Sequence, residues 1–346
     1  MTKSPLATLL TLLAFSFVVV LAKDEPVLDW ASHPFGFQAR TSNVKVGLSS
    51  DFIYYPAVHS DSSSLSFKHQ QLTNFSFLPN HQLVNGNLIT VSTVSGGHFQ
   101  ILGANGRCCQ PSMKFSRSNA PCKERTSTTA MNNNCIVATN AGFFDVASGY
   151  CLGNVISNGK MLDDHERNTA SFGFVDNGKE SKFVMGYLNK TDAEHVKMQQ
   201  LVQGSLWLVR DGKSFVNESI IIEKTGRGFC EEKAPRVAIG HDIAGQLMIL
   251  QVDGYEPTRT GLDVYEMTYL AQLLGFHNAI NLDGGGSATT YIKGYPTLFV
   301  SNSGFLVDNR SQNQCSDGCS EVVGNMCPNA KQGRCERHVT TIVCLK

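Results

Sequence analysis

The sequence predicts an α+β protein of mixed β-sheets, in which strands joined by hairpins outnumber helices and disulfide bonds staple the fold. Three observations predict this class. Short runs of alternating apolar and polar residues recur between turn dipeptides along most of the chain. One segment, 262–274, instead carries apolar residues at helical spacing. The chain also holds 11 cysteines, more than an enzyme of a reducing compartment usually contains.

Residues 1–22 are expected to be a signal peptide. Lys3 precedes an apolar run over 6–21, and Val20-Leu21-Ala22 resembles a cleavage site. A membrane anchor is the alternative, but the run barely reaches the length that spans a bilayer. We expect 23–45 to be a lead-in or pro-segment and 46–346 to be the folded domain.

Cysteine and sequon content predicts an oxidising compartment. Asn-x-Ser/Thr sequons occur at Asn74, Asn189, Asn217 and Asn309, and the odd number of cysteines leaves one unpaired or intermolecular. Lys+Arg and Asp+Glu balance at 29 each, so nothing favours nucleic acid or an anionic membrane as partner. We expect the mature protein in the lumen of the secretory pathway (Golgi or lysosome) or outside the cell.

The elements between 46 and 252 are predicted to be strands and turns. Alternation over 46–105 indicates strands, and 106–134 is expected to be a long loop pinned by Cys108, Cys109 and Cys122. A short buried strand follows at 135–139. Three hairpins are predicted: 172–175 with 183–187 across Asn177-Gly178, 206–210 with 214–216 across Asp211-Gly212, and 237–240 with 246–252.

The next segment predicts a strand–helix–strand unit over 247–282. Strands 247–252 and 279–282 flank helix 262–274, which Gly275 would end. Such a unit normally places its strands parallel, with a right-handed crossover. Asp253 and Asp283, which follow the two strands, should therefore meet at one sheet edge, where Asn140 is a candidate to join them. Farther on, the stretch 315–344 has five cysteines and is expected to be stapled by disulfides.

The run from Asn278 to Ser287 ends an apolar strand with Asp283, Gly284, Gly285, Gly286 and Ser287. Consecutive glycines are kept where side chains must be absent, so we expect a tight loop whose N–H groups face an anion or sugar. A turn without a ligand is the alternative. The pattern is neither a P-loop nor a dinucleotide fingerprint, because no Gly-Lys-Ser/Thr ending and no helix follow.

Asp253 and Asp283 are candidates for a pair of carboxylates that cleave a glycosidic bond; a turn and a loop cap are their structural alternatives. Arg236 would hold a phosphodiester through two parallel hydrogen bonds, or else form a structural ion pair. Glu266 is expected in the middle of the helix, facing the sheet edge or solvent. His241, next to Asp242, is expected in a turn; an acid/base pair is the alternative.

Metal and nucleophile patterns are weak. The histidines and cysteines do not occur at the spacings of zinc sites, and Cys315 and Cys319 lack a second pair of ligands. Ser287 lacks the Gly-x-Ser-x-Gly context of a hydrolase nucleophile. We therefore expect no metal and no cofactor, with a divalent ion held by two aspartates as the minority alternative.

At these residues the chain resembles the phosphodiester glycosidase family. The resemblance covers roughly 45–346 in order. The matching blocks are 140–144, 151–154, 236–241, 253–254, 261 with 266–267, 278–289, 334–335 and 339–344.

The resemblance implies a hydrolase that cleaves N-acetylglucosamine from a phosphate also esterified to mannose on glycans of lysosomal enzymes, and so exposes mannose 6-phosphate. It implies that the site residues are Asn140, Arg236, Asp253, Asp283, Ser287, the glycines 284–286 and, less strongly, Glu266. Among them we expect the three acids to be catalytic and the others to bind substrate.

Departures from the family keep other functions open. Animal members carry a growth-factor-like module, a membrane span and a cytoplasmic tail that are not found before Lys346, so we expect no span after signal cleavage. Tyr150 replaces an expected acid, and the loop 255–260 is one residue longer than expected. The alternatives are a secreted carbohydrate-binding protein without turnover and a metal-dependent phosphodiesterase.

Overall fold

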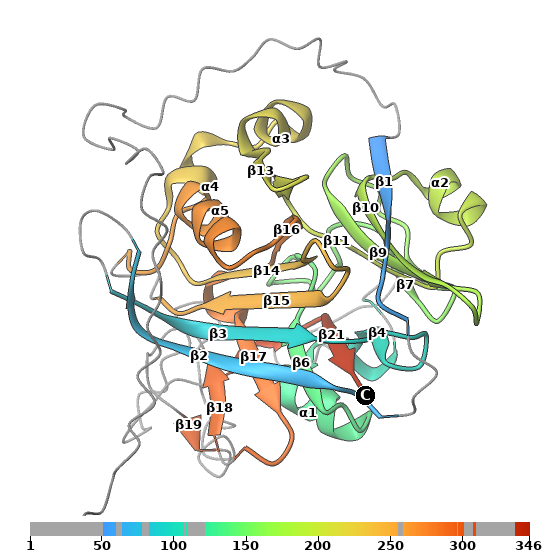
Figure 1. Ribbon diagram of the computed structural model, residues 1–346, viewed down its shortest axis with the longest axis horizontal. Coiled ribbons are helices and arrows are strands. Elements are labelled where there is room, and N and C mark those ends of the chain that lie inside the picture. Colours follow the sequence, from blue (N-terminus) through green and yellow to red (C-terminus); the bar gives the residue numbers. More distant parts are fainter. Residues whose placement is uncertain are drawn as a thin grey trace, which may run out of the picture. The chain divides into compact units, whose positions relative to one another are not determined.

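The computed structural model describes residues 51–59, 64–77, 83–106, 108, 122–254, 259–295, 297–300, 307–308 and 336–346 (Figure 1). The expected signal peptide, the lead-in 23–45, the sequon at Asn309 and most of the cysteine-rich stretch 315–344 lie outside the described residues.

The described strands form three large sheets and one small one, paired antiparallel. The first sheet has the order β1 (Asp51–Pro56), β10 (Ser181–Tyr187), β9 (Ser171–Asp176), β11 (Gln200–Gln203), β7 (Val155–Ser157), β8 (Lys160–Asp163). The second has the order β13 (Lys213–Ser214), β12 (Trp207–Arg210), β16 (Asn278–Leu282), β14 (Arg236–His241), β15 (Leu247–Val252), β3 (Leu83–Val91), β2 (Phe67–Ser76). The third has the order β19 (Val307–Asp308), β18 (Thr297–Val300), β17 (Thr289–Ile292), β6 (Val137–Asn140), β21 (Thr341–Leu345), β4 (Phe99–Gly103). The short strands β20 (His338–Val339) and β5 (Glu124–Arg125) pair separately.

Helices are short and lie on the sheet faces. The α-helices are α1 (Thr126–Asn132), α2 (Lys190–His195), α3 (Val216–Glu223), α4 (Arg227–Glu231) and α5 (Val264–Leu273); the 3₁₀ turns are η1 (Ala104–Gly106) and η3 (Gly285–Ser287). Figure 1 shows α3, α4 and α5 gathered on one side of the second sheet.

Hydrophobic cores cover both faces of the second sheet, which explains why its central strands are apolar along their whole length. One face contributes residues such as Ile239 and Ile249 to a core shared with the first and third sheets. The other face contributes Ala238 and Leu250 to a core closed by the helices. With both faces covered, β14, β15 and β16 are buried throughout their lengths.

The predicted α+β class and two of the hairpins are confirmed. β9 and β10 pair across Asn177-Gly178, and β14 pairs with β15. The hairpin at Asp211-Gly212 is shorter than expected because Val216 begins α3 instead of extending a strand. The loop expected over 106–134 was wrong in its second half, which contains β5 and α1.

The strand–helix–strand unit is present with one strand inserted. Helix α5 starts at a capping box between Asp263 and Glu266, and Gly275, at φ 91°, follows its last turn. Strands β15 and β16 each pair antiparallel with β14, which lies between them. They therefore run in the same direction, as predicted, without being neighbours.

Disulfides join segments distant in the chain. Cys135 pairs with Cys344, 209 residues away, and Cys108 pairs with Cys151. Cys230 is buried as a free thiol in the described part of the chain. Among the described residues, no helix has the length and apolar character needed to cross a membrane.

Candidate active site

Two aspartates end strands that run to the same edge of the second sheet. Asp253 follows β15 and Asp283 follows β16, while β14 begins between them at Arg236. Arg236 lies opposite Val252, and Val237 lies opposite Leu282. Two strand spacings separate the backbones of the acids by about 10 Å. The edge that the sequence predicted is therefore present, and both aspartates are partly buried in it.

The glycine loop is packed tightly against the start of β14. A Cβ at Gly284 would lie 2.5 Å from the carbonyl oxygen of Pro235, and the N–H of Gly285 donates to that same oxygen at 2.8 Å. Gly285 has φ 54°, in the left-handed region that favours glycine. The glycines thus permit an approach between two backbones that other residues would prevent.

Several N–H groups of this loop donate to backbone carbonyls of the protein, unlike the expectation of a row of donors for an anion. Ser287 N–H donates to the Gly284 carbonyl, and Ala288 N–H donates to that of Gly285. Asp283 N–H donates to the carbonyl of Ala141. The loop therefore forms a turn fixed by backbone hydrogen bonds, and binding of a phosphate here would require a further source of positive charge.

Asn140 joins the two ends of the loop. Its side chain is fully buried; Nδ2 donates to the carbonyl oxygen of Asp283 at 2.7 Å, and Oδ1 accepts from the N–H of Thr289 at 3.1 Å. Because Asn140 ends β6, the third sheet positions a loop that leaves the second. Its expected role in binding substrate stays a prediction. The contacts observed for Asn140 hold the two ends of the loop together.

Arg236 does not present the free guanidinium that we expected to hold a phosphodiester. Its Nη2 donates to the carbonyls of Phe229 at 3.1 Å and Glu232 at 2.6 Å, and its Nε donates to that of Leu262 at 3.1 Å. The guanidinium also lies 4.9 Å from the centre of the Phe229 ring. The reason is strand alternation: Arg236 shares the helix-facing side of β14 with Ala238, so it binds α4 and the chain before α5.

Glu266 is in the first turn of α5, so the prediction of a mid-helix position was wrong. Its Oε2 accepts from the N–H of Asp263 at 3.1 Å to complete the capping box, and its Oε1 binds the ammonium of Lys233. The carboxylate is buried in these contacts. They assign Glu266 to helix initiation, which is a sufficient reason for an acid at this position.

Arg337 is a residue of this region that the sequence did not reveal. A Cβ at Gly286 would lie 2.4 Å from its Nη2, so the guanidinium packs directly on the loop backbone. Its Nη1 is 3.5 Å from the hydroxyl of Ser287, and its Nε is buried without a hydrogen-bond partner. A single arginine 50 positions after the loop carries no local signal that links the two.

Burial changes the chemistry of Asp253. Removal from water raises its pKa to about 7, well above the ordinary value of 3.8. The Nε2 of Gln251 donates to its Oδ1 at 3.1 Å. A carboxyl group that titrates near neutral pH can hold or accept a proton during a reaction.

His241, the other titratable candidate, lies at the far end of β14 from the two aspartates. Its ring is stacked between Tyr55 and Phe183, and burial lowers its pKa to about 4. Its Nε2 lies 3.2 Å from the Nδ2 of Asn278. The prediction of a turn position for His241 was wrong, because His241 is the last residue of β14 and pairs with Leu247 and Asn278.

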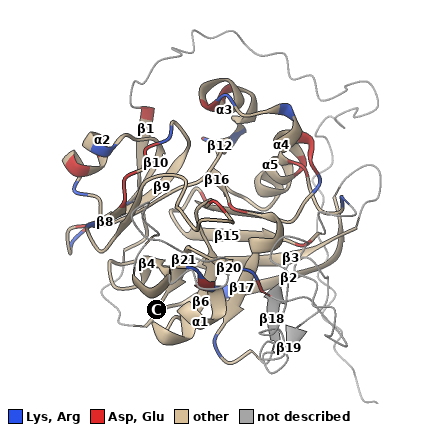
Figure 2. Cartoon of the chain, turned by 180° about the vertical axis from the view of Figure 1, so that it is seen from behind, with Lys and Arg blue, Asp and Glu red and all other residues tan. Residues whose placement is uncertain are grey.

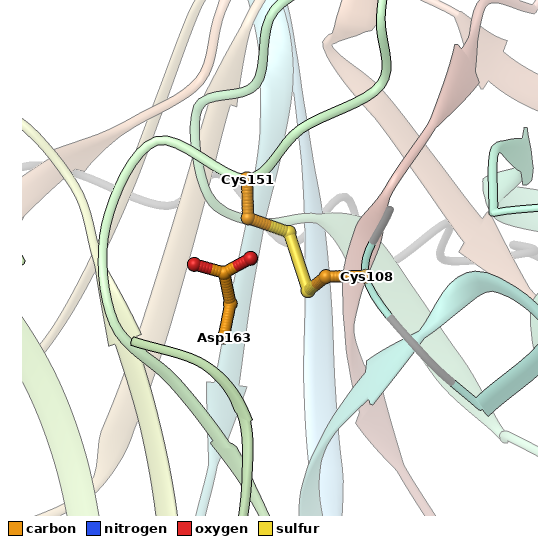
Figure 3. A group of neighbouring side chains, drawn as sticks. All are labelled: Cys108, Cys151 and Asp163. Carbon is orange, nitrogen blue, oxygen red and sulfur yellow. A yellow bond between two sulfur atoms is a disulfide. The ribbon is translucent and has the colours of Figure 1, made fainter. Parts of the chain in front are cut away.

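Potential metal ligands meet at one place in the described part of the chain, among Cys108, Cys151 and Asp163 (Figure 3). The two sulfurs are joined as a disulfide, which removes them as thiolate ligands. The Asp163 Oδ1 accepts from the ring Nδ1 of His165 at 2.7 Å. The disulfide therefore staples the chain beside β8, and this group does not include Asp253 or Asp283.

Basic and acidic residues are interspersed along the elements of the described chain. Figure 2 shows α2 and α4 each carrying both basic and acidic residues. Against the glycine loop, Arg337 contributes a positive charge.

Comparison with known proteins identifies relatives of this chain. The family model for phosphodiester glycosidase matches residues 133–345, which contain the candidate site but not β2 and β3. N-acetylglucosamine-1-phosphodiester alpha-N-acetylglucosaminidase of Mus musculus is 35% identical over 227 residues, which cover 63% of this chain and 38% of that protein. The Homo sapiens protein of the same name is 35% identical over 231 residues, covering 63% and 39%. The chain thus spans less than half the length of these relatives.

A solved structure extends the similarity. The catalytic domain of the zebrafish N-acetylglucosamine-1-phosphodiester alpha-N-acetylglucosaminidase, described as auto-inhibited by its pro-peptide, matches with a TM-score of 0.65 and 29% identity. The match covers 85% of this chain and 87% of that one. A protein from Synechocystis, with a TM-score of 0.51 and 14% identity over 83% and 64% of the two chains, shares the fold.

Proposed function

Because the chain belongs to the phosphodiester glycosidase family, we propose that it hydrolyses N-acetylglucosamine-α-1-phosphodiesters, releasing N-acetylglucosamine and leaving a phosphomonoester. The natural substrate in this proposal is N-acetylglucosamine-phospho-mannose on N-glycans of lysosomal-type enzymes, and the product is exposed mannose 6-phosphate. Mouse and human relatives carry the corresponding enzyme name.

One observation carries the proposal: two aspartates end same-direction strands at one sheet edge, beside a rigid glycine loop and an arginine. Hydrolysis of a sugar phosphodiester at the anomeric carbon needs a carboxylate near that carbon and positive charge near the phosphate. Asp253 and Asp283 supply the first requirement, and Arg337 supplies the second.

The reaction in this proposal breaks the bond between the anomeric carbon and the phosphate oxygen. A water oxygen becomes bonded to the anomeric carbon, one of its protons passes to a carboxylate, and the bonding electrons leave with the phosphate. A phosphomonoester is a stable leaving group, so protonation of its oxygen is less important than for a sugar leaving group. Asp253, whose pKa is about 7, suits the proton acceptor, and Asp283 suits stabilisation of the positive charge on the sugar.

Ser287 and Arg337 are proposed to bind the phosphate. Their side chains meet at the end of the glycine loop, with Nη1 and Oγ 3.5 Å apart. An arginine guanidinium suits phosphate because it presents paired donors in a fixed plane. Gly286 leaves the space in which the guanidinium lies on the loop.

The experiment is an assay of purified protein with N-acetylglucosamine-α-1-phospho-methylmannoside, with and without a chelator. Release of free N-acetylglucosamine that the chelator does not reduce supports the proposal. Binding without product would support a carbohydrate-binding protein instead. Release of N-acetylglucosamine phosphate that the chelator stops would support a metal-dependent phosphodiesterase, which cuts the bond from phosphorus to oxygen.

We predict that Asp283→Asn lowers kcat roughly 100- to 10,000-fold, because an amide cannot stabilise a sugar cation as a carboxylate does. The matched control is Asp211→Asn, which changes an exposed turn residue with φ 51°, a conformation that asparagine tolerates. Both variants should be secreted and unfold cooperatively. Near-normal turnover by Asp283→Asn would remove this acid from the mechanism.

The proposed setting is the lumen of the secretory pathway or the cell exterior, where glycan phosphodiesters and disulfides both occur. Three expected glycosylation sites fall in the described chain: Asn74 is exposed on β2, Asn189 caps α2, and Asn217 lies in the first turn of α3. Mass spectrometry after glycosidase treatment tests whether each carries a glycan.

A further inference from the structure

We propose that Gln251, Asn87 and His69 form a hydrogen-bonded chain that positions the carboxylate of Asp253 for the reaction. The inference rests on the proposed function, which gives Asp253 a part in catalysis. Three neighbouring strands supply the chain: β15 carries Gln251, β3 carries Asn87, and β2 carries His69. Gln251 and Asn87 are direct cross-strand partners, so the register itself brings their side chains together.

The distances define a continuous connection from the edge of the sheet to the acid. The Nε2 of His69 lies 2.9 Å from the Oδ1 of Asn87, and the Nδ2 of Asn87 lies 3.4 Å from the Oε1 of Gln251. The Nε2 of Gln251 then donates to the Oδ1 of Asp253 at 3.1 Å. At the outer end, the Nδ1 of His69 lies 3.4 Å from the hydroxyl of Tyr295.

The acceptor at the inner end sets the direction of every bond. An ionised carboxylate only accepts, so Gln251 must turn its amide nitrogen to Asp253 and its oxygen to Asn87. Asn87 must then donate to Gln251 and accept from His69, which carries a proton on Nε2. Each link therefore donates toward Asp253, and the chain favours one orientation of its carboxylate.

Burial argues that the two amides are not present for stability. Gln251 is 0% exposed and Asn87 is 2% exposed. They occupy the face of β15 and β3 that also carries Ile249 and Ile89 of the central core. Buried amides cost free energy unless hydrogen-bonded, and an apolar pair of similar size would pack there without that cost. The carboxylate of Asp253, at the end of the hydrogen-bonded chain, gives the reason for amide side chains at these two positions.

Two opposing effects then act on Asp253. Burial raises its pKa, whereas a donor on its carboxylate stabilises the charged form and lowers it. Loss of the Gln251 donor should therefore raise the pKa further. The limb of the pH–rate profile that belongs to Asp253 should move to higher pH, whether that residue reacts as acid or as base.

The test is Gln251→Met, which keeps the length of the side chain and removes the amide. We expect kcat on N-acetylglucosamine-α-1-phospho-methylmannoside to fall roughly 10- to 100-fold, the KM to change little, and one limb of the profile to rise by about one pH unit. Asn87→Leu, which leaves Gln251 without its orienting partner, should move the same limb by a smaller amount.

Gln200→Met is the matched control, since Gln200 is also a buried glutamine on a strand. Gln200 is on β11 of the first sheet, where its Oε1 accepts from the N–H of Ile101 on β4 at 2.9 Å and its Nε2 donates to the Oδ1 of Asn158 at 2.8 Å. It should lose stability without moving the pH profile. His69→Phe, on the half-exposed edge strand β2, provides a variant that folds even if a core substitution does not, and its kcat should fall several-fold.

The outcomes separate this inference from the function on which it rests. Wild-type protein that releases no N-acetylglucosamine contradicts the proposed function. Active wild-type protein whose Gln251→Met, Asn87→Leu and His69→Phe variants keep the wild-type kcat and pH profile overturns the positioning chain alone. A shift of the limb in Gln251→Met that is absent from Gln200→Met supports it.

Discussion

At Gly284 the candidate loop lies directly against the backbone that leads into β14. A Cβ there would lie 2.5 Å from the Pro235 oxygen, a separation that real Cβ atoms do not show. Because that oxygen belongs to the backbone, the strand or the loop must shift to relieve the clash. The loop carries Asp283 at its first position, so the shift displaces a candidate catalytic group as well.

We predict that Gly284→Ala destabilises the protein by about 1 to 3 kcal/mol and lowers kcat more than it raises KM. Urea unfolding and steady-state kinetics measure the two effects. Gly97→Ala is the control, since an added Cβ at Gly97 meets nothing within 4 Å. Equal stability of the two variants would show that the loop relaxes freely.

Local signals and long-range contacts explain which site residues the sequence revealed. Asp253 and Asp283 were predicted because each directly follows an apolar strand, and that relation is visible within ten residues. The sequence did not predict which face of β14 carries Arg236. Because β14 is buried on both faces, it has no alternation of polar and apolar residues that would indicate the side facing the helices. Arg337 was missed because only tertiary packing brings it to Gly286.

At the scale of elements, Arg236 connects the second sheet to the helical layer. It is 4% exposed and binds three backbone carbonyls, two in or beside α4 and one just before α5. The carbonyls near helix ends need donors, and this side chain supplies them. The helical layer near Asp253 and Asp283 is therefore held by a residue we had expected to bind substrate.

We predict that Arg236→Met lowers the free energy of unfolding by roughly 3 kcal/mol, because buried carbonyls lose their charged donor. Hydrogen exchange in α4 should accelerate as well. Arg210→Met is the comparison: Arg210 pairs with Asp51, whose side chain is 46% exposed and can regain water, so the loss should be smaller. A variant of Arg236 with unchanged stability and weaker substrate binding would restore the original expectation.

The elements differ in how far their sequences determined them. Hairpins such as β9–β10 were predictable because alternation and an Asn-Gly turn lie within one short window. The insertion of β14 between β15 and β16 was not, since it depends on pairing with strands on both sides. The short helices α1 and α3 were missed because they are set by tertiary packing and not by a long periodic pattern.

At the scale of the whole molecule, Glu223 links two sheets. This last residue of α3 accepts from the N–H of Leu206, which precedes β12, at 2.8 Å, and from that of Ala170, which precedes β9, at 3.1 Å. Burial raises its pKa to about 7 despite these donors. The folded chain therefore binds a proton here under conditions in which the unfolded chain has lost it.

We predict that Glu223 alone lowers the free energy of unfolding by roughly 2 to 3 kcal/mol as pH rises from 4.5 to 7. The sign follows because an acid with a higher pKa in the folded state binds more protons folded than unfolded within this window. Asp253 contributes in the same direction. Urea unfolding at several pH values measures the slope. Glu223→Gln should flatten it, and Asp253→Asn should flatten it further; an unchanged slope in both would contradict the assignment.

Strand β21 lies inside the third sheet, between β6 and β4, and Cys344 on it is bonded to Cys135. The ribosome synthesises residues in order. Strand β6, which ends at Asn140, can therefore pair with β21 only after some 200 further positions have been made. Arg337 arrives in that same late stretch. A nascent chain that already contains both aspartates and all three loop glycines therefore still lacks Arg337 and the neighbour of β6, so the proposed site is complete only after the C-terminal stretch has been made.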